Sequence, residues 1–210
     1  MKNKALATVI LIFTFCIQIY SQLNFNAGSQ FKSGVSYGKM TDSRDGKVYK
    51  TVKIGTQTWL AENLSYKTTT GSFAFDLDES IAERYGRLYD WKTATTACPR
   101  GWHLPSNAEW NQLIEFLGGD SIAGSKVKAA KGWMPTNAAG NNSSGFCGLG
   151  AGYRHDDCTF GSLGLNANFW SATPVDSTLV WGRNLNYMSE KVNLRKYSRT
   201  NFYSIRCVKD

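Results

Sequence analysis

Residues Cys98 to Gly119 read CPRGWHLPSNAEWNQLIEFLGG, and this stretch carries the clearest helix signal in the chain. Ser106 and Glu109 form a capping box, in which the hydroxyl and the carboxylate each accept a hydrogen bond from a backbone N–H at the start of a helix. Apolar side chains then recur at helical spacing, at Trp110, Leu113, Ile114 and Leu117. Gly118-Gly119 supplies a left-handed stop, so a helix is expected between these signals.

The segment before this helix predicts strands. Apolar and polar residues alternate from Val48 to Ile54, as they do in a half-buried strand. Gly55-Thr56 then turns the chain into TQTWLAENL, which is the expected hairpin partner. A third strand is expected at Tyr85–Trp91, followed by a short helix over residues 92–97.

The chain changes character after a second, weaker helix that is expected over Asp120–Lys131. From Gly145 onward it is a series of short strands separated by glycine turns, such as GFCGLGAGYR, TLVWGRNLNY and FYSIRCVK. Central helices within a mostly antiparallel set of strands predict an α+β fold.

The first residues have the order of a secretory signal peptide. Lys2 and Lys4 precede an apolar stretch that is too short for a typical membrane span, and the chain turns polar at Ser21. We therefore expect a signal peptide over 1–21, a polar lead-in or tether over 22–41 and one domain over 42–210. Cys16 would leave with the signal peptide, no integral membrane segment would remain, and the protein would be exported to the periplasm, the outer cell surface or the medium.

Four cysteines follow the expected cleavage site: Cys98, Cys147, Cys158 and Cys207. An even number of cysteines in an exported chain predicts two disulfides, and the residues alone leave all three pairings open. The formal net charge is +8, but the lysines and arginines are scattered and do not form a run. Nucleic acid is therefore not an expected partner.

Several motifs resemble those of one protein family. They are IGTQTWLAENLSY (54–66), YGRLYDW (85–91), CPRGWHLPSNAEW (98–110), NFWSAT (168–173) and SIRCVKD (204–210). Together they resemble the Fibrobacter succinogenes major paralogous domain from about Asp42 to Asp210. LPSNAEW and the closing RCV also resemble motifs of the wider superfamily of C-type lectins and formylglycine-generating enzymes.

This resemblance implies a C-type-lectin-like fold, with central helices packed on short, mostly antiparallel strands and braced by two disulfides. In such folds a disulfide ties the first helix region to the last strand, so the resemblance implies the pair Cys98–Cys207. Cys147 and Cys158 would then form the second disulfide as local bracing.

The sequence gives little support to catalysis or to a cofactor. A formylglycine-generating oxidase needs two nearby cysteines for copper, and Cys207 has no such neighbour in the sequence. The Ca²⁺ motifs of lectins are not intact in ATPVDS (172–177) or VWGRNL (180–185), so Asp176 and Asp156-Asp157 are expected to be solvated loop acids. His155 with Cys147 and Cys158 fits no common zinc spacing. We expect no metal, no cofactor and no catalytic residue, and His103 is expected to hydrogen-bond the turn before the helix.

One group of residues suggests a binding surface in the C-terminal third. Aromatic faces beside polar groups suit sugar rings or protein partners. The candidate ligand-binding residues are Arg154, His155, Trp181, Arg183, Asn186 and Tyr187. Trp170 is expected to lie in the core. The same is an alternative for Trp181. The resulting hypothesis is a non-catalytic binding or adhesion module of a bacterial cell surface or periplasm, with a glycan or a surface protein as ligand. An oxidase-like enzyme and a purely structural surface protein are the alternatives.

Overall fold

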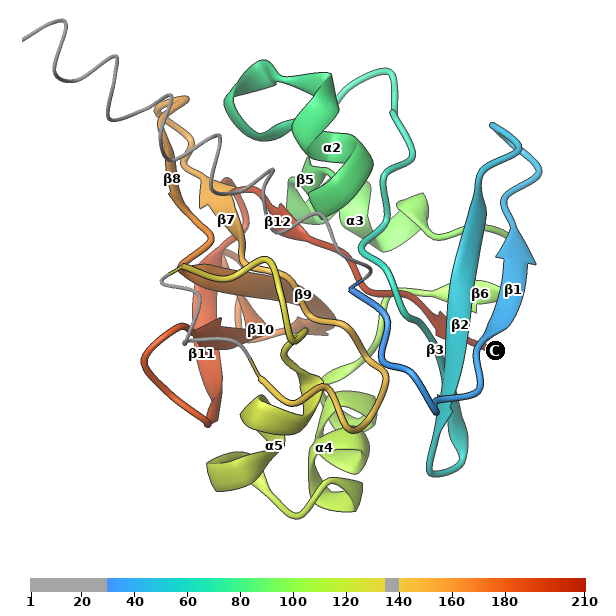
Figure 1. Cartoon of the computed structure of the whole chain (residues 1–210). Helices are drawn as coiled ribbons and strands as arrows, with labels where there is room; N and C mark the ends of the chain where they lie inside the picture. Colours follow the sequence, from blue (N-terminus) through green and yellow to red (C-terminus); the bar gives the residue numbers. More distant parts are fainter. Residues whose placement is uncertain (1–29, 135–139) are drawn as a thin grey trace, which may run out of the picture.

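The computed structural model describes residues 30–134 and 140–210, and the expected signal peptide and the first part of the lead-in lie outside these ranges. Two curled β-sheets face each other across the core, with short helices at their ends (Figure 1). None of the helices in the described ranges is long and apolar enough to cross a membrane.

The first sheet has five strands in the order β1-β2-β3-β13-β6. They are β1 (Gly38–Thr41), β2 (Val48–Ile54), β3 (Gln57–Leu60), β6 (Trp102–His103) and β13 (Val208–Lys209). The predicted hairpin is confirmed, because β2 pairs antiparallel with β3 from Thr51↔Leu60 to Ile54↔Gln57. β1 comes from the expected lead-in and pairs with β2 at the sheet edge.

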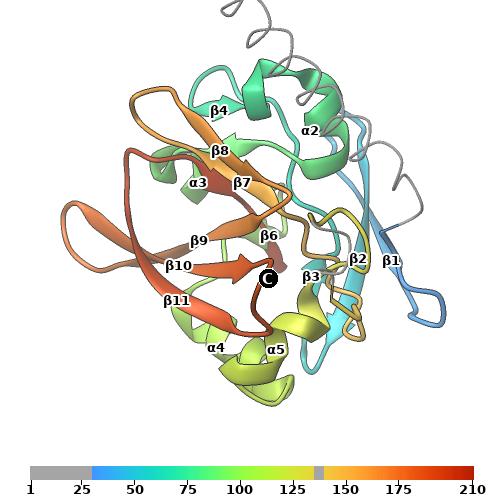
Figure 2. The same cartoon turned by 60° about the vertical axis from the view of Figure 1, so that its left-hand side comes forward.

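The second sheet has eight strands, of which six follow the order β11-β10-β9-β12-β5-β4. Its main strands are β9 (Asn166–Pro174), β10 (Leu179–Asn186) and β11 (Val192–Ser198). β4 (Ser72–Phe73), β5 (Leu88–Tyr89) and β12 (Tyr203–Ser204) are short, and β7 (Ala151–Arg154) pairs with both β9 and β8 (Phe160–Leu163). In Figure 2 the ribbons of β9, β10 and β11 run side by side, with α4 and α5 below them.

The described part of the chain has four α-helices, α2 (Glu79–Tyr85), α3 (Trp91–Ala97), α4 (Asn107–Phe116) and α5 (Asp120–Val127), and a 3₁₀ turn, η1 (Phe75–Leu77). The capping box predicted for α4 is confirmed, because Ser106 and Glu109 satisfy each other's backbone N–H groups. α5 is shorter than predicted. Helix α2 was not predicted from the sequence, and only Leu88–Tyr89 forms a strand in the predicted segment Tyr85–Trp91.

The core is mainly aromatic. Trp59 of β3, Trp110 of α4 and Phe146 meet between the two sheets, with ring centroids 5.0 to 5.8 Å apart. Trp170 of β9 is fully buried, as expected, and its indole N–H donates to the Tyr89 carbonyl at 2.7 Å. The Cys98–Cys207 disulfide packs into the same core and joins the end of α3 to the last strand, which confirms the pairing that the resemblance implied.

The predicted C-type-lectin-like fold, with central helices and two disulfides, is wrong. The molecule is mostly β, and its helices, of 7 to 10 residues, cover the ends of two curled sheets. The local patterns predicted several elements, but the architecture depends on distant pairings such as Ser204↔Leu88 and Ser204↔Phe169. Such pairings leave no periodic signal in the sequence.

The predicted Cys147–Cys158 disulfide is also wrong, because among the described residues the disulfide is Cys98–Cys207, and Cys147 and Cys158 are both free thiols. Cys147 is fully buried, where its sulfur contacts the Asn142 amide at 3.1 Å and the Tyr37 hydroxyl at 3.4 Å. Cys158 is exposed in the turn between β7 and β8. Strand β7 lies between Cys147 and Cys158 in the sequence and spans about 10 Å. It therefore holds the two cysteines apart, whereas a disulfide needs Cα atoms within ~7 Å of each other.

Candidate functional site

The floor of the candidate site consists of asparagines on one face of β9 and β10. In each strand two asparagines alternate with core residues, so Asn166 and Asn168 share a face, as do Asn184 and Asn186. The antiparallel register places Asn184 opposite Asn168 and Asn186 opposite Asn166. Ala167 and Leu185, which lie between the asparagines, and Phe169, which follows Asn168, pack into the core on the other face. The alternation that places the apolar residues in the core therefore places the four asparagine side chains together on the other face of the sheet.

These four amides form one hydrogen-bonded network. The Asn184 amide donates to Asn168 Oδ1 at 2.9 Å, and the Asn186 amide donates to Asn166 Oδ1 at 3.0 Å. Each amide has two N–H donors and an oxygen with two lone pairs. The pairing within the network therefore fixes the orientation of the side chains and still leaves donors and acceptors for a ligand.

Tyrosines form the wall of the site. Tyr197 of β11 donates from its hydroxyl to Asn168 Oδ1 at 2.7 Å, and its ring centroid lies 4.3 Å from that of Tyr203. Tyr153 of β7 stands edge-on to Tyr203 at 6.5 Å. Burial raises the pKa of Tyr197 far above its ordinary value and that of Tyr203 to about 12, so both are neutral hydroxyls at physiological pH.

Floor and wall together enclose a hollow of about 300 Å³ on the surface of the second sheet. It is lined by Tyr153, His155, Asn166, Asn168, Asn184, Asn186, Arg195, Tyr197 and Tyr203. None of these nine residues is a carboxylate or a nucleophile such as Ser or Cys. The hollow therefore offers hydrogen-bonding groups and aromatic faces.

Two of the six residues proposed from the sequence, His155 and Asn186, line this hollow. Two others are buried arginines. Arg154 lies between the rings of Phe73 and Phe202, with its guanidinium carbon 4.2 and 4.5 Å from their centroids, and Arg183 donates to Asn111 Oδ1 at 2.6 Å.

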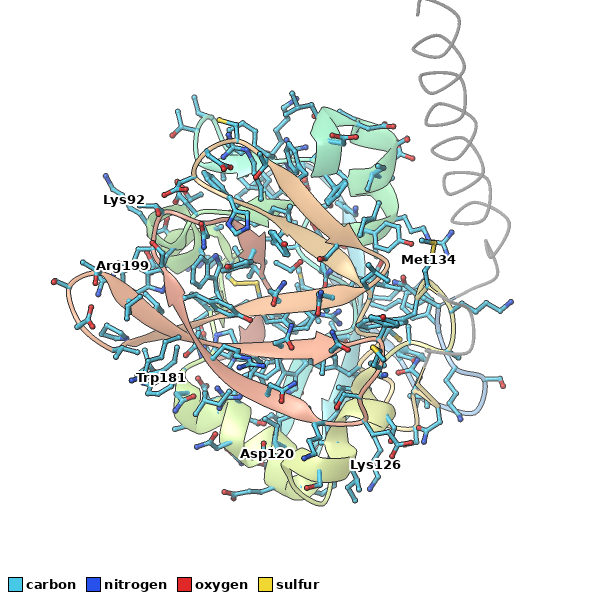
Figure 3. The ribbon with its side chains drawn as sticks, turned by 90° about the vertical axis from the view of Figure 1, so that its left-hand side faces the viewer. Lys92, Asp120, Lys126, Met134, Trp181 and Arg199 are labelled. Carbon is cyan, nitrogen blue, oxygen red and sulfur yellow. A yellow bond between two sulfur atoms is a disulfide. The ribbon has the colours of Figure 1, made fainter. Side chains whose placement is uncertain are left out.

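The remaining two proposed residues, Trp181 and Tyr187, do not line the hollow. Trp181 lies three positions before Asn184 in β10, so its side chain is on the face of the sheet opposite to the hollow. There it pairs with Lys196 of β11. In Figure 3 it lies near the outer ends of β9 and β10, away from the centre of the sheet. Tyr187 is half-buried against the core.

Seven of the nine lining residues were not among the six candidates proposed from the sequence: Tyr153, Asn166, Asn168, Asn184, Arg195, Tyr197 and Tyr203. A signal was present in the two Asn-x-Asn pairs, NAN over 166–168 and NLN over 184–186. Residues at alternate positions of a strand share a face, and asparagine is depleted in strands, so two such pairs stand out. Tyr203 carried no such signal, because β12 joins the sheet by a parallel contact with β9.

Within residues 30–134 and 140–210 no group of three His, Cys, Asp or Glu side chains is placed to hold a metal ion. The carboxylates that the sequence offered for Ca²⁺ make local turn contacts instead. Asp176 accepts hydrogen bonds from Thr178 and Leu179, and Asp157 from Thr159. These contacts lower the pKa of both carboxyl groups.

One protein family matches the chain, the Fibrobacter succinogenes major domain, over residues 52–209. The chain belongs to this family. The matched region of the Fibrobacter succinogenes major domain runs from within β2 to the end of β13 and includes all nine residues of the hollow. Comparisons with curated proteins and with solved structures gave no match. The family membership is thus shown, and the wider superfamily has no such support.

Proposed function

We propose that this Fibrobacter succinogenes major domain is a non-catalytic binding module that holds carbohydrate in the amide-lined hollow. The observation that carries the proposal is the floor of four paired asparagines beside the Tyr153 and Tyr197 side chains. Amides donate and accept hydrogen bonds at the same time, as sugar hydroxyls do. A rigid array of amides therefore matches a ligand with several adjacent hydroxyls, and tyrosine rings offer faces for its apolar C–H groups.

A protein partner fits the same surface less well. The fully buried core of a protein interface is more apolar than the rest of the protein surface. Here the centre of the hollow is polar, and the large exposed apolar side chains, including Phe116 and Met188, belong to other parts of the surface. A small concave site with convergent polar groups is typical of a small-molecule or sugar site.

We propose further that the module acts outside the cytoplasm, in the periplasm, on the cell surface or in the medium. Two observations support export: the signal-peptide pattern in the first 21 residues, and the Cys98–Cys207 disulfide, since disulfides persist mainly in oxidising compartments. At the cell envelope, a binding or adhesion module would meet surface polysaccharides, which are ligands of the proposed class.

The test is a glycan array followed by calorimetric titration of the tightest hit. Asn184→Ala/Asn186→Ala removes two donors from the floor, and we expect affinity to fall roughly tenfold or more, since each hydrogen bond contributes about 0.5–1.5 kcal/mol. Asn141→Ala, in an exposed loop, is the matched control and should bind like wild type.

Trp181→Ala separates this site from the surface first suggested by the sequence. Trp181 is on the opposite face of β10, so its loss should leave the affinity unchanged. Binding that is lost in Trp181→Ala and kept in the double asparagine variant would move the site to that face. An array without any hit would contradict the carbohydrate proposal.

A further inference from the structure

The charge of the hollow's rim points to a narrower ligand class. His155, which follows β7, and Arg195 of β11 bring an imidazole and a guanidinium to the same hollow, and none of the nine lining residues is an acid. Arg195 shares the face of Asn193 and Tyr197, because these residues alternate along β11. The guanidinium is therefore on the side of the amide network and not on the core side.

Both groups have donor capacity to spare. Among the described residues, neither the Arg195 guanidinium nor the His155 ring nitrogens make a hydrogen bond or an ion pair, although the His155 ring packs edge-on against Tyr153 at 4.7 Å. By contrast, the chain's other histidine, His103, is bound at both ring nitrogens by carboxylates. A guanidinium has five N–H donors in a planar fork that matches a carboxylate.

We propose, as an extension of the carbohydrate site, that the hollow selects acidic sugars: a hexuronic acid unit whose carboxylate is held by Arg195 and His155. The sugar's hydroxyls would bind the asparagine floor. The carboxylate and the hydroxyls of one ring lie a few ångströms apart, which suits a hollow that has cations at its rim and neutral amides at its floor. This inference rests on the proposed function, because it specifies the ligand of the same site.

The neighbouring strand position supplies a matched control. Lys196 follows Arg195 in β11 but is on the opposite face, with its ammonium nitrogen 5.2 Å from the Trp181 ring centroid. Arg195→Gln and Lys196→Gln therefore change the net charge of the protein by the same amount, one at the hollow and one away from it. General electrostatic attraction would respond equally to both variants, whereas a specific carboxylate site responds only to the first.

The experiment is calorimetric titration with a pair of oligosaccharides that differ only in charge: an oligomer of galacturonic acid and the same oligomer with its carboxyl groups reduced to hydroxymethyl. We expect wild type to bind the acid at least about tenfold more tightly, which equals ~1.4 kcal/mol. Arg195→Gln should remove this preference and bind the two oligomers alike. Lys196→Gln should keep the preference.

Three outcomes would overturn the inference. If wild type binds both oligomers equally well and Asn184→Ala/Asn186→Ala weakens binding of each, the carbohydrate site stands and the preference for acidic sugars is wrong. If Arg195→Gln and Lys196→Gln lose the same amount of affinity for the acidic oligomer, the preference comes from the net charge of the protein and not from a specific carboxylate site. Competition by a sulfated oligosaccharide or by free acetate as strong as that by the galacturonic acid oligomer would show a general anion site and not a uronic acid site.

Discussion

Arg206 shows at the scale of one residue how the closing RCV motif stabilises the fold. Its side chain is fully buried and donates to the Leu60 carbonyl at 3.1 Å, to Asn63 Oδ1 at 2.7 Å, and to the carbonyls of Phe146 and Cys147. Its guanidinium also lies over the Phe146 ring. Burial lowers the pKa of Arg206 to about 10, which still leaves it charged at neutral pH. One side chain thus binds β3, the segment after it and the loop before β7.

Arg206→Met should therefore destabilise the protein, although it replaces a buried charge by an apolar group of similar length. The four acceptors would stay buried without their donor, and each unsatisfied group costs about 1–3 kcal/mol before relaxation. We expect the free energy of unfolding in urea to fall by at least about 2 kcal/mol. Arg195→Met, at an exposed position, should stay within ~0.5 kcal/mol of wild type. Equal stabilities of the two variants would show that Arg206 does not hold the core.

At the scale of elements, α4 is held at its start by a chain of polar contacts. Ser106 and Glu109 close the capping box, and the His103 ring joins Glu109 to Asp210, at 2.7 Å on each side. The sequence predicted the box, and it predicted that His103 would bond locally. Partial burial lowers the pKa of His103, but the hydrogen bonds to Asp210 and Glu109 raise it by more, so its pKa lies above the ordinary value.

The raised pKa of His103 sets the sign of a pH effect. A group whose pKa is higher in the folded state adds stability that is complete below its unfolded pKa, here about 6.5, and that is lost as pH rises through the folded pKa. The free energy of unfolding of wild type relative to His103→Gln should therefore fall between pH 6 and pH 9, as measured by urea unfolding at several pH values. Asn141→Ala, in an exposed loop, removes no titratable group and is the control, which should show no such trend relative to wild type. A difference between wild type and His103→Gln that grows with pH would contradict this assignment.

Local sequence patterns are sufficient to predict some elements of this fold and not others. Helix α4 was predictable because its cap, its apolar spacing and its Gly118 stop all lie within one short segment. Helix α2 carries a comparable signal, with Asp78 as its N-cap and Ile81 and Tyr85 on one face, but it is only two turns long and was not recognised. The hollow needed the register of β9 against β10, and pairs such as Asn184↔Asn168 follow from turn geometry and not from composition.

At the scale of the whole molecule, a disulfide joins the end of α3 to the residue before β13, the last strand. Cys98 and Cys207 lie 109 residues apart in sequence, and closing a loop of this size stabilises a fold by about 4–5 kcal/mol in the chain-entropy model. The resemblance predicted this pair correctly. It failed for Cys147 and Cys158 because pairing by exclusion assumes that every cysteine is oxidised, whereas the fold buries one thiol and exposes the other.

The two remaining thiols should differ sharply in reactivity. In the folded, unreduced protein, iodoacetamide should label Cys158 within minutes and leave Cys147 unlabelled until denaturant is added, because only Cys158 is exposed. Peptide mapping by mass spectrometry identifies each site separately. Cys158→Ser should abolish labelling of the folded chain at the described cysteines. Recovery of a peptide in which Cys147 is linked to Cys158 would contradict the structure.

The central claim, that the asparagine floor binds carbohydrate, is tested most directly by nuclear magnetic resonance of the side-chain amides. The ¹⁵N-labelled protein is titrated with the tightest glycan from the array, and the NH₂ signals of all asparagines are followed. Binding should shift the signals of Asn166, Asn184 and Asn186, which line the hollow, and leave that of the buried Asn63 unchanged. Shifts confined to the indole signal of Trp181 and its neighbours, with the signals of Asn166, Asn184 and Asn186 unchanged, would contradict the claim.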